Sequence, residues 1–445
     1  LLETGHDILF FWVARMVFFG QKLLGKLPFK EVYLHPIIRD AHGRKMSKSL
    51  GNVIDPMDVI NGISLEGLHD QLCDSNLDYK EIDKAKQGQK QDYPDGIPEC
   101  GTDALRFALC AMCQGRDINL DILRVQGYRF FCNKIWNATK FALNYLNSGF
   151  QIPSGNNLIG SESLIDKWML SRVAFAVAEA NKGFETYEFT LTTTVIYNLW
   201  LYDLCDVYLE HLKSVFASND PVGIKAAQAT LFRTLNIGLR LLSPFMPFIT
   251  EELYQRLPSA KDDLVKIPSI CVSSYPEVED CNWRDENVEN QMEFIQKLAK
   301  AIRSARSDYN LPNKTKTEVY IQCSDKTYTD ITKNFIPVLQ TLAYCSKVAI
   351  DSEIPTGCTI ITVSDKCEAH LLLKGLIDPS KEISKLEKKF GFLEVTSSKL
   401  TQSMNIPDYT TKVPIEVQQA NSEKLLQVNA ELERLRNAIE ALKLM

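Results

Sequence analysis

The stretch Gly43-Arg44-Lys45-Met46-Ser47-Lys48-Ser49-Leu50-Gly51-Asn52 decides how the rest of this chain is interpreted. Two lysines and an arginine lie among serines and glycines, without the apolar periodicity that would bury them. Serine and glycine keep such a loop mobile, so ammonium groups and hydroxyl or amide donors can fold over a polyphosphate. A basic surface turn is the plainer interpretation of this composition, and the residue types alone leave both open.

The composition is that of an ordinary globular protein and contains no low-complexity tract. Its 445 residues, 45% of them hydrophobic and 24% charged, are enough for two or three domains with cores of their own. The formal net charge of -6 gives no argument for nucleic-acid binding from bulk charge. Any RNA site must therefore be a local basic surface on an acidic body.

Cysteine usage and hydropathy exclude several other classes of protein. Twelve cysteines are spread over the chain, and only Cys110 and Cys113 have the C-x-x-C spacing of a zinc site, without a second ligand pair. We therefore expect buried free thiols in a reducing compartment and no protein-bound metal. The longest apolar stretch, Ile8 to Leu24, contains charged residues and is too short to span a bilayer, so no membrane is expected as a partner.

The first 25 residues are predicted to form a turn followed by a helix. Gly5 and Asp7 open the helix, and apolar residues then recur three and four positions apart. Asp7 in the first turn favours the positive end of the helix dipole and is able to hold a ligand hydroxyl or ammonium group. Ile8 and Trp12 lie one turn apart on the same face, and their periodicity alone favours a role in the core for both.

Two segments carry a resemblance to a known family. Lys45-Met46-Ser47-Lys48-Ser49, flanked by Gly43-Arg44 and Gly51-Asn52, resembles the signature loop of class I aminoacyl-tRNA synthetases. The segment Glu3-Thr4-Gly5-His6-Asp7-Ile8-Leu9-Phe10-Phe11-Trp12-Val13-Ala14-Arg15-Met16 is similar to the one that precedes this loop in the valyl branch of the family. The isoleucyl branch carries a different segment at this place, so the match discriminates within the class.

The resemblance implies an ATP site and a valine pocket. The residues expected to bind ATP, with Mg²⁺ accompanying the nucleotide, are Lys45, Met46, Ser47, Lys48 and Ser49. Lys45 and Lys48 are the expected catalytic residues, because a positioned cation stabilises the charge that develops on phosphates in the transition state. Ile8 and Trp12 are expected to wall the valine side chain, and Asp7 to lie beside the aminoacyl-adenylate.

Residues 1–122 are expected to be the C-terminal part of a class I catalytic domain, the remnant of a Rossmann-like fold. Residues 31–40 are predicted to form one buried strand that leads into the lysine loop. Thr102 or Asp103 is expected to cap a helix that runs to Met112, at the junction with the next domain.

Residues 123–285 are helical almost throughout, and the resemblance implies that they form an anticodon-binding bundle. The first helix is predicted to bury an apolar stripe that contains Phe130, Trp136 and Phe141. Its polar face offers cations and amides to tRNA through Arg129, Asn133, Lys134 and Asn137. A solvated face without a ligand is the alternative interpretation.

Residues 286–377 are predicted to form a long helix and a small α/β domain. Arg303 and Arg306 are expected to share one face of that helix and to contact the tRNA backbone. Residues 378–445 contain two helices with apolar residues at heptad spacing, around a segment with two prolines. We expect an antiparallel coiled coil that acts as a tRNA-binding arm, as in the valyl enzymes, with dimerisation through this tail as the alternative.

The whole chain therefore reads as mainly α with α/β parts, and it resembles the cytoplasmic valyl-tRNA synthetases. The implied enzyme, a valine–tRNA ligase, activates valine with ATP and transfers it to tRNA-Val. The chain begins Leu1-Leu2 rather than Met, and it lacks the family's upstream adenylation motif and editing domain. We therefore expect a truncated chain that does not activate valine by itself.

Two other interpretations remain open at this point. One is a non-catalytic tRNA-binding module, which would not need the lysine loop or the pocket segment. The other is a different branched-chain aminoacyl-tRNA synthetase, against which the Phe11-Trp12-Val13-Ala14-Arg15-Met16 segment argues. Nothing in the sequence identifies a translation factor or a synthetase complex as a partner.

Overall fold

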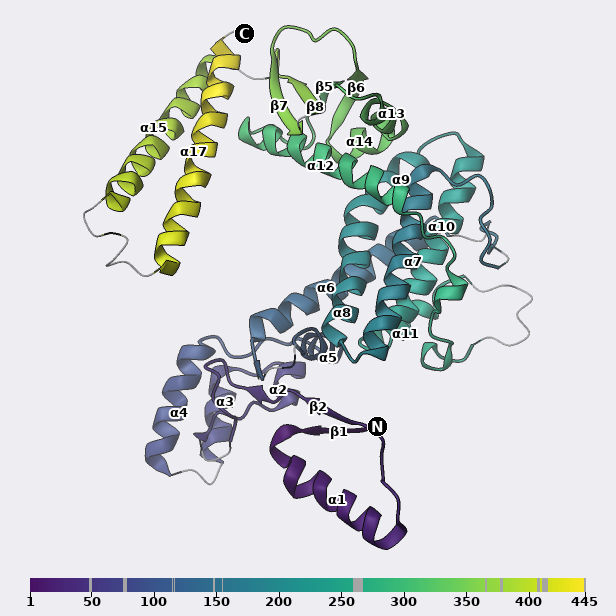
Figure 1. The fold of residues 1–445 in the computed structure, drawn as a ribbon, viewed down its shortest axis with the longest axis vertical. Helices are drawn as coiled ribbons and strands as arrows, with labels where there is room; N and C mark the ends of the chain where they lie inside the picture. The colour runs from purple at the N-terminus through teal and green to yellow at the C-terminus, as the bar shows by residue number, and fades with distance from the viewer. Residues whose placement is uncertain are drawn as a thin grey trace. The chain divides into compact units, whose positions relative to one another are not determined.

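The computed structural model describes residues 1–47, 50–74, 78–113, 115, 117–146, 149–153, 155–258, 267–364, 366–376, 379–405, 409 and 415–443. Two compact units divide the chain, Leu1–Glu286 and Asn287–Met445, and each is described by itself. Helices dominate both units, and small sheets complete them (Figure 1). The expected mainly helical fold with α/β parts is confirmed, whereas the division into four domains stays a prediction.

The first unit starts with short strands and helices and continues as a helical bundle. Its first part contains β1 (Leu2–Gly5), η1 (His6–Ile8), η2 (Leu9–Val13), α1 (Ala14–Phe19), η3 (Gly20–Leu24), β2 (Val32–His35), β3 (Ile38–Arg39), α2 (Pro56–Asn61), α3 (Leu65–Cys73), α4 (Tyr79–Asp92), α5 (Thr102–Ala111) and β4 (Ile118–Asn119). The bundle contains α6 (Ile122–Leu143), α7 (Leu164–Glu185), α8 (Phe189–Asn198), η5 (Leu199–Tyr208), α9 (Leu209–Phe216), α10 (Pro221–Leu242), α11 (Pro247–Tyr254), η6 (Ile270–Val272) and η7 (Val278–Asp280).

The segment that leads to the lysine loop differs from the prediction in two places. The expected turn at residues 1–5 is strand β1, which pairs in parallel with β2. The single strand expected over residues 31–40 is split into β2 and β3, because Pro36 between them has no N–H to continue the ladder. Strand β3 then pairs in parallel with β4. The segment that leads to the loop therefore contributes to two separate two-stranded sheets, β1-β2 and β3-β4.

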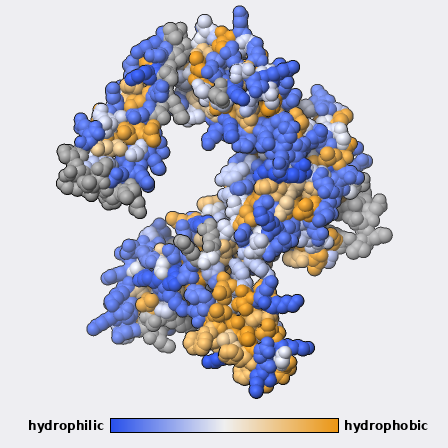
Figure 2. Space-filling model, in the orientation of Figure 1, coloured by the Kyte–Doolittle hydropathy of each residue, from blue (hydrophilic) through white to orange (hydrophobic). Residues whose placement is uncertain are grey.

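The helical segment between β1 and β2 exposes its apolar side chains. Figure 2 shows the hydrophobic surface that results at this end of the first unit. The large exposed side chains there are Ile8, Leu9, Phe10, Phe11, Trp12, Phe18, Phe19, Leu23 and Leu24. Parallel sheets are normally covered on both faces, and an apolar surface of this extent marks an interaction site. The core role that periodicity favoured for Ile8 and Trp12 is therefore wrong for this chain.

The bundle buries a continuous core, and α6 packs into it by a face other than the predicted one. Val125, Phe131 and Ile135 are buried, and the Phe131 ring centroid lies 4.6 Å from that of Tyr197 on α8. Phe130 and Trp136 are exposed, so the predicted apolar stripe is wrong. Each residue turns an α-helix by about 100°, and a stripe misplaced by one residue is enough to exchange buried for exposed positions.

Asp103 joins two helices rather than capping its own. Helix α5 begins after Gly101, and neither Thr102 nor Asp103 caps it by a side-chain hydrogen bond. The buried carboxylate of Asp103 instead accepts hydrogen bonds from the backbone N–H of Phe248, at 3.2 Å, and of Ile249, at 2.7 Å. These are orphan donors in the first turn of α11. Burial raises the pKa of Asp103, and the two hydrogen bonds oppose that rise.

The second unit combines a mixed sheet with packed helices. Its elements are α12 (Glu286–Asp308), β5 (Thr317–Cys323), α13 (Lys326–Asn334), α14 (Ile336–Leu342), β6 (Cys345–Ile350), β7 (Cys358–Ser364), β8 (Cys367–Leu372), α15 (Pro379–Met404) and α17 (Ile415–Lys443). The strand order is β6-β5-β8-β7, with β5 and β6 parallel and the other neighbours antiparallel. This unit therefore contains a small mixed sheet with helices, as expected, whereas the bounds of an α/β domain over residues 286–377 stay a prediction.

Arg306 has a structural role, which corrects the expectation that it contacts tRNA. Only 2% of Arg306 is exposed. Its guanidinium donates hydrogen bonds to four acceptors, which are Thr317 Oγ1 (2.8 Å), Thr315 O (2.7 Å), Pro312 O (3.1 Å) and Tyr344 O (3.4 Å). Arg303 is exposed, so the two arginines do not share a solvent-facing surface. A buried guanidinium needs such partners, and they leave Arg306 unable to reach an external phosphate.

Helices α15 and α17 lie side by side in opposite directions (Figure 1). Ser397 Oγ is 2.8 Å from Asn429 Oδ1, and Lys389 Nζ is 2.8 Å from Glu431 Oε1. The ion pair between Glu387 and Lys443, at 3.5 Å, continues this antiparallel order. The most buried described side chains in the pair are Leu386, Val428, Leu435 and Ile439, which occupy the heptad positions read from the sequence. Supercoiling of the two helices stays a prediction.

The Asp103 contact predicts a measurable loss of stability. Replacing Asp103 with Ala leaves the first N–H groups of α11 without acceptors, and we expect the first unit to lose about 1–2 kcal/mol of unfolding free energy. Thr102→Ala is the matched control, because Thr102 lies on the same turn without a capping bond. Urea unfolding followed by tryptophan fluorescence measures both. Equal stability of the two variants would contradict the assignment.

Candidate active-site loop and RNA-facing helix

The buried carboxylate of Asp40 holds the start of the lysine loop. Oδ1 accepts hydrogen bonds from the backbone N–H of His42 (3.1 Å) and of Arg44 (2.8 Å). Oδ2 accepts from Arg44 Nε (2.7 Å) and from Asn52 Nδ2 (3.0 Å). Burial acts to raise the pKa of Asp40, but the bonds from Asn52 and Arg44 outweigh it and lower the pKa. The carboxylate is therefore ionised at neutral pH and fixes the turn that precedes Lys45.

Asn52 holds the other end of the loop. Besides its bond to Asp40, Asn52 Nδ2 donates to the backbone oxygen of Lys45 at 3.3 Å. Its Oδ1 accepts from the backbone N–H of Ser47 at 3.0 Å. Asp40 and Asn52 together thus join the two ends of the loop. Neither residue was predicted from the sequence, although an Asp at the end of an apolar strand and an amide that closes a Gly/Ser loop were available signals.

Lys45 connects the loop to the segment that carries the expected valine pocket. Its Nζ lies 3.1 Å from Oδ2 of Asp7, and both side chains are exposed to solvent. The hydrogen bond from Lys45 is the main cause that lowers the pKa of Asp7. Two segments that are 38 residues apart in sequence are brought together by this contact.

The other predicted residues of the ATP site and the pocket are only partly placed. Met46 and Ser47 are half-buried, whereas Lys48 and Ser49 lie outside the described residues. Ile8 is 42% exposed and Trp12 is 43% exposed. The described part of the chain therefore does not enclose these two side chains in a pocket.

The base of the loop is tied to the chain that enters the bundle. Arg39 Nε donates to Asp117 Oδ2 at 2.6 Å, and Asp117 Oδ1 accepts from the backbone N–H of Ile37 at 3.2 Å. Since Asp117 precedes β4 and α6 follows shortly after, the lysine loop and the first bundle helix share one anchor. The hydrogen bonds from Arg39 and Ile37 lower the pKa of Asp117.

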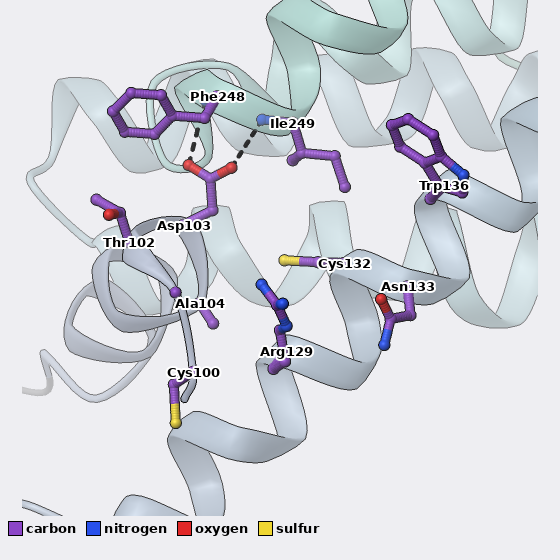
Figure 3. A pocket seen from close by; sticks show the side chains of 11 residues that line it. Cys100, Thr102, Asp103, Ala104, Arg129, Cys132, Asn133, Trp136, Phe248 and Ile249 are labelled. Atoms are coloured by element: carbon purple, nitrogen blue, oxygen red, sulfur yellow. Dashed lines mark hydrogen bonds between the residues drawn. The ribbon is translucent and has the colours of Figure 1, made fainter. Parts of the chain in front are cut away.

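A cavity of about 330 Å³ lies between the start of α5, the outer face of α6 and the start of α11 (Figure 3). Arg129, Asn133 and Trp136 line it from α6. Figure 3 shows them opposite the helix-joining contact of Asp103. Arg129 forms an exposed ion pair with Glu99 at 3.3 Å. This wall offers a cation, an amide and an aromatic ring, the side chains that contact phosphate and bases in single-stranded RNA.

Gly101 is required where this cavity begins. Its φ of +82° is strained for other residues, and a Cβ there would lie 2.9 Å from Arg129 Nη1. Glycine therefore lets the guanidinium lie against the backbone at the entry to α5.

The predicted RNA face of α6 is accessible in the structure. Asn133, Lys134 and Asn137 are exposed, and Arg129 is partly exposed. The Trp136 ring is also partly open to solvent, with the guanidinium carbon of Arg256 5.6 Å from the ring centroid. The four predicted residues thus lie on one solvent-facing surface, to which Trp136 adds a ring that sequence reasoning had assigned to the core.

The described residues do not form a metal-binding site. Within the part of the chain that the structure describes, no group of three or more His, Cys, Asp or Glu side chains is arranged to hold a metal ion. All twelve cysteines are free thiols, and burial raises the pKa of Cys110 to about 11.

The hydropathy of the helices also bears on the expected partners. Among the helices of the described ranges, none combines the length and the apolar character that crossing a bilayer requires.

Two family models match the chain. Residues 1–121 match the tRNA synthetases of class I for isoleucine, leucine, methionine and valine, and residues 166–321 match the anticodon-binding domain of tRNA ligases. The first match contains the lysine loop and the Lys45–Asp7 contact, and the second begins within helix α7.

Curated relatives match nearly the whole chain. It is 52% identical to a valine–tRNA ligase of Mus musculus, over 99% of this chain and 35% of that protein. A valine–tRNA ligase of Caenorhabditis elegans is 47% identical, over 100% of this chain and 43% of that protein. A mitochondrial valine–tRNA ligase of Saccharomyces cerevisiae is 45% identical, over 100% and 40%. The chain thus spans about a third to two-fifths of the length of these relatives. On these matches and on the loop geometry, the chain belongs to the class I tRNA synthetase family.

Proposed function

We propose that this chain carries the nucleotide loop and the tRNA-binding part of a valine–tRNA ligase. In the proposed reaction, the carboxylate of valine attacks the α-phosphate of ATP to give valyl-adenylate and pyrophosphate. The valyl group then passes to the terminal ribose of tRNA-Val. The observation that carries the proposal is the 3.1 Å contact between Lys45 Nζ and Asp7 Oδ2, since it joins the two segments that such a reaction needs. ATP is the substrate that class I synthetases share.

The proposed role of the loop is electrostatic. Lys45 and Lys48 bind the phosphates, with Met46, Ser47 and Ser49 completing the ATP contacts and Mg²⁺ bound to the nucleotide. A unit charge pair about 4 Å apart is worth about 4 kcal/mol at an effective dielectric of about 20. The hydrogen bonds of Asp40 and Asn52 support this role for Lys45, because a backbone that is already held in place presents its cation without a large ordering cost.

The ion pair of Asp7 with Lys45 indicates which role the Asp7 carboxylate would have in the proposed reaction. Its carboxylate is ionised and exposed, so it is suited to hold the ammonium group of an amino acid beside the adenylate. Lys45 Nζ contacts this carboxylate in the structure. ATP phosphates would draw Lys45 away and free Asp7 for valine, while Ile8 and Trp12 would contact the branched side chain.

The proposed tRNA contacts are two separate sets, Arg129, Asn133, Lys134 and Asn137 on α6 of the first unit and Arg303 on α12 of the second unit. All five are exposed or partly exposed, which supports the proposal.

The rest of residues 123–285 would act as the anticodon-binding bundle, and residues 378–445 as an antiparallel coiled-coil arm. Residues 1–122 would be part of a Rossmann-like catalytic domain, and residues 286–377 would hold the small α/β domain. We propose the cytoplasm as the location, from the resemblance to cytoplasmic valyl enzymes.

A non-catalytic tRNA-binding module is the second candidate. The exposed face of α6 fits it equally well. The hydrogen bond between Asp40 and Asn52 and the contact of Lys45 with Asp7 favour the enzyme. A module that only binds RNA has no use for a lysine held beside Asp7.

Loss of a loop lysine tests the proposal. We expect Lys48→Ala to slow valine-dependent ATP–pyrophosphate exchange about 10²–10³-fold, the size of losing one preorganised donor. The assay uses a polypeptide that also contains the remaining catalytic region. Lys84→Ala is the matched control, because Lys84 is an exposed lysine that forms an ion pair with Glu81 on its own helix. Near-normal exchange by Lys48→Ala would overturn the proposal.

The α6 surface has a separate test. We expect Lys134→Ala to weaken binding of a tRNA-Val transcript and to reduce the slope of log affinity against log salt by about 1. Trp136→Ala should weaken the same complex by about 1–3 kcal/mol if a base stacks on the ring. Lys213→Ala on α9, an exposed lysine paired with Glu210, is the control. Unchanged affinity and salt slope in both α6 variants would place the RNA elsewhere.

A further inference from the structure

The small sheet of the second unit holds two cysteines opposite each other. Cys323 ends β5, Cys367 begins β8, and the antiparallel register pairs them directly. Their Sγ atoms are 3.7 Å apart. Directly opposed residues of an antiparallel pair point to the same face, so the two thiols meet across the strands.

The backbone hydrogen bonds identify which kind of cross-strand pair this is. Ser324 N donates to Lys366 O at 3.0 Å, one step beyond the cysteines. The N–H of Cys323 points away from β8, to Asp351 Oδ1 at 3.4 Å. Cys323 and Cys367 therefore form a non-hydrogen-bonded pair, in which the Cα atoms are about 4.5 Å apart. That separation is within the range of disulfides, and the sulfurs need to approach by only about 1.7 Å.

A cavity gives access to this pair from solvent. Its volume is about 460 Å³, and its lining residues are Gln322, Cys323, Ser324, Asp351, Lys366, Cys367 and Glu368. Cys323 is half-buried and Cys367 is buried, so a reagent in the cavity reaches Cys323 first. Lys366 adds a cation to the wall, although it lies 3.9 Å from Asp325.

We propose that Cys323 and Cys367 are an oxidative modification site, at which a low-molecular-weight disulfide turns the two thiols into one intramolecular disulfide. The Cys323 thiolate attacks one sulfur of the reagent RSSR, its S–S bond breaks, and RS⁻ leaves. The Cys367 thiolate then attacks the Cys323 sulfur of the mixed disulfide, and the second RS⁻ leaves. The protein gives up two electrons and two protons, and RSSR is reduced to two RSH.

The surroundings of the two thiols set the rate of this reaction. Burial raises the pKa of Cys367 to about 12 and also raises the pKa of Cys323. Negative charge on Glu368 and Asp351 opposes ionisation of Cys367 further. Because the thiolate is the attacking species, oxidation is slow at neutral pH and accelerates as the pH rises.

The disulfide would join the two central strands of the sheet. The strand order β6-β5-β8-β7 puts β5 and β8 in the middle, and the two cysteines are 44 residues apart in sequence. A cross-link over a loop of this length restricts the unfolded chain, so the oxidised second unit should unfold at a higher temperature than the reduced one.

Oxidation of the full 445-residue chain tests the proposal. The chain is incubated with oxidised glutathione at pH 7 and at pH 9, the remaining thiols are alkylated, and peptides are mapped by mass. We expect a peptide pair linked through Cys323 and Cys367, reversed by dithiothreitol, and a rate that rises roughly tenfold per pH unit. The proposal is overturned if both cysteines stay free while the exposed Cys73 and Cys271 take up glutathione.

Single variants separate the two steps. Cys367→Ser should accumulate a glutathione adduct on Cys323, because the resolving thiol is absent. Cys323→Ser should leave Cys367 unmodified. Cys271→Ser, which removes an exposed thiol of the first unit, should close the Cys323–Cys367 disulfide at the parent rate. A glutathione adduct on Cys323 that persists in the parent chain would also overturn the proposal.

Discussion

The hydrogen bonds around the buried carboxylate of Asp40 are the constraint on which the candidate active site depends. Four donors from the lysine loop and its flanks converge on this one side chain. Asn52 extends this network, because its Nδ2 donates both to Asp40 Oδ2 and to the backbone oxygen of Lys45, while its Oδ1 accepts from the backbone N–H of Ser47. The backbone of Lys45 and Ser47 is thereby held in place, and Lys45 Nζ contacts Asp7.

The same region has a large unsatisfied surface. The parallel pair β1 and β2 and the helical segment between them expose large apolar side chains, Phe10 and Leu24 among them. Such a surface is costly in water and favours contact with another apolar surface. Ile8 and Trp12 belong to it, so the amino-acid pocket proposed around them requires a further wall.

The sequence predicted patterns that depend on local spacing. The heptad stripe of the tail fell on buried positions such as Leu386 and Val428, and Asn133 and Lys134 are exposed as their polarity indicated. Predictions from the sequence failed where a partner outside the local segment determines what a side chain contacts. Thr102 or Asp103 was expected to cap α5, but the carboxylate of Asp103 accepts hydrogen bonds from α11, about 145 residues away. Arg306 looked like a surface cation, yet a pocket of carbonyl oxygens from the next segments buries it.

The contact between Lys45 and Asp7, which the hydrogen bonds of Asn52 maintain, is directly measurable in solution. A carbodiimide joins a carboxylate and an amine only when they are in contact, so zero-length cross-linking of the chain followed by peptide mapping measures it directly. We expect a Lys45–Asp7 cross-link that is lost or strongly reduced in Asn52→Ala, while the Lys84–Glu81 pair, at 2.8 Å on one helix, still reacts. A chain that cross-links Lys84 to Glu81 but never Lys45 to Asp7 would contradict it.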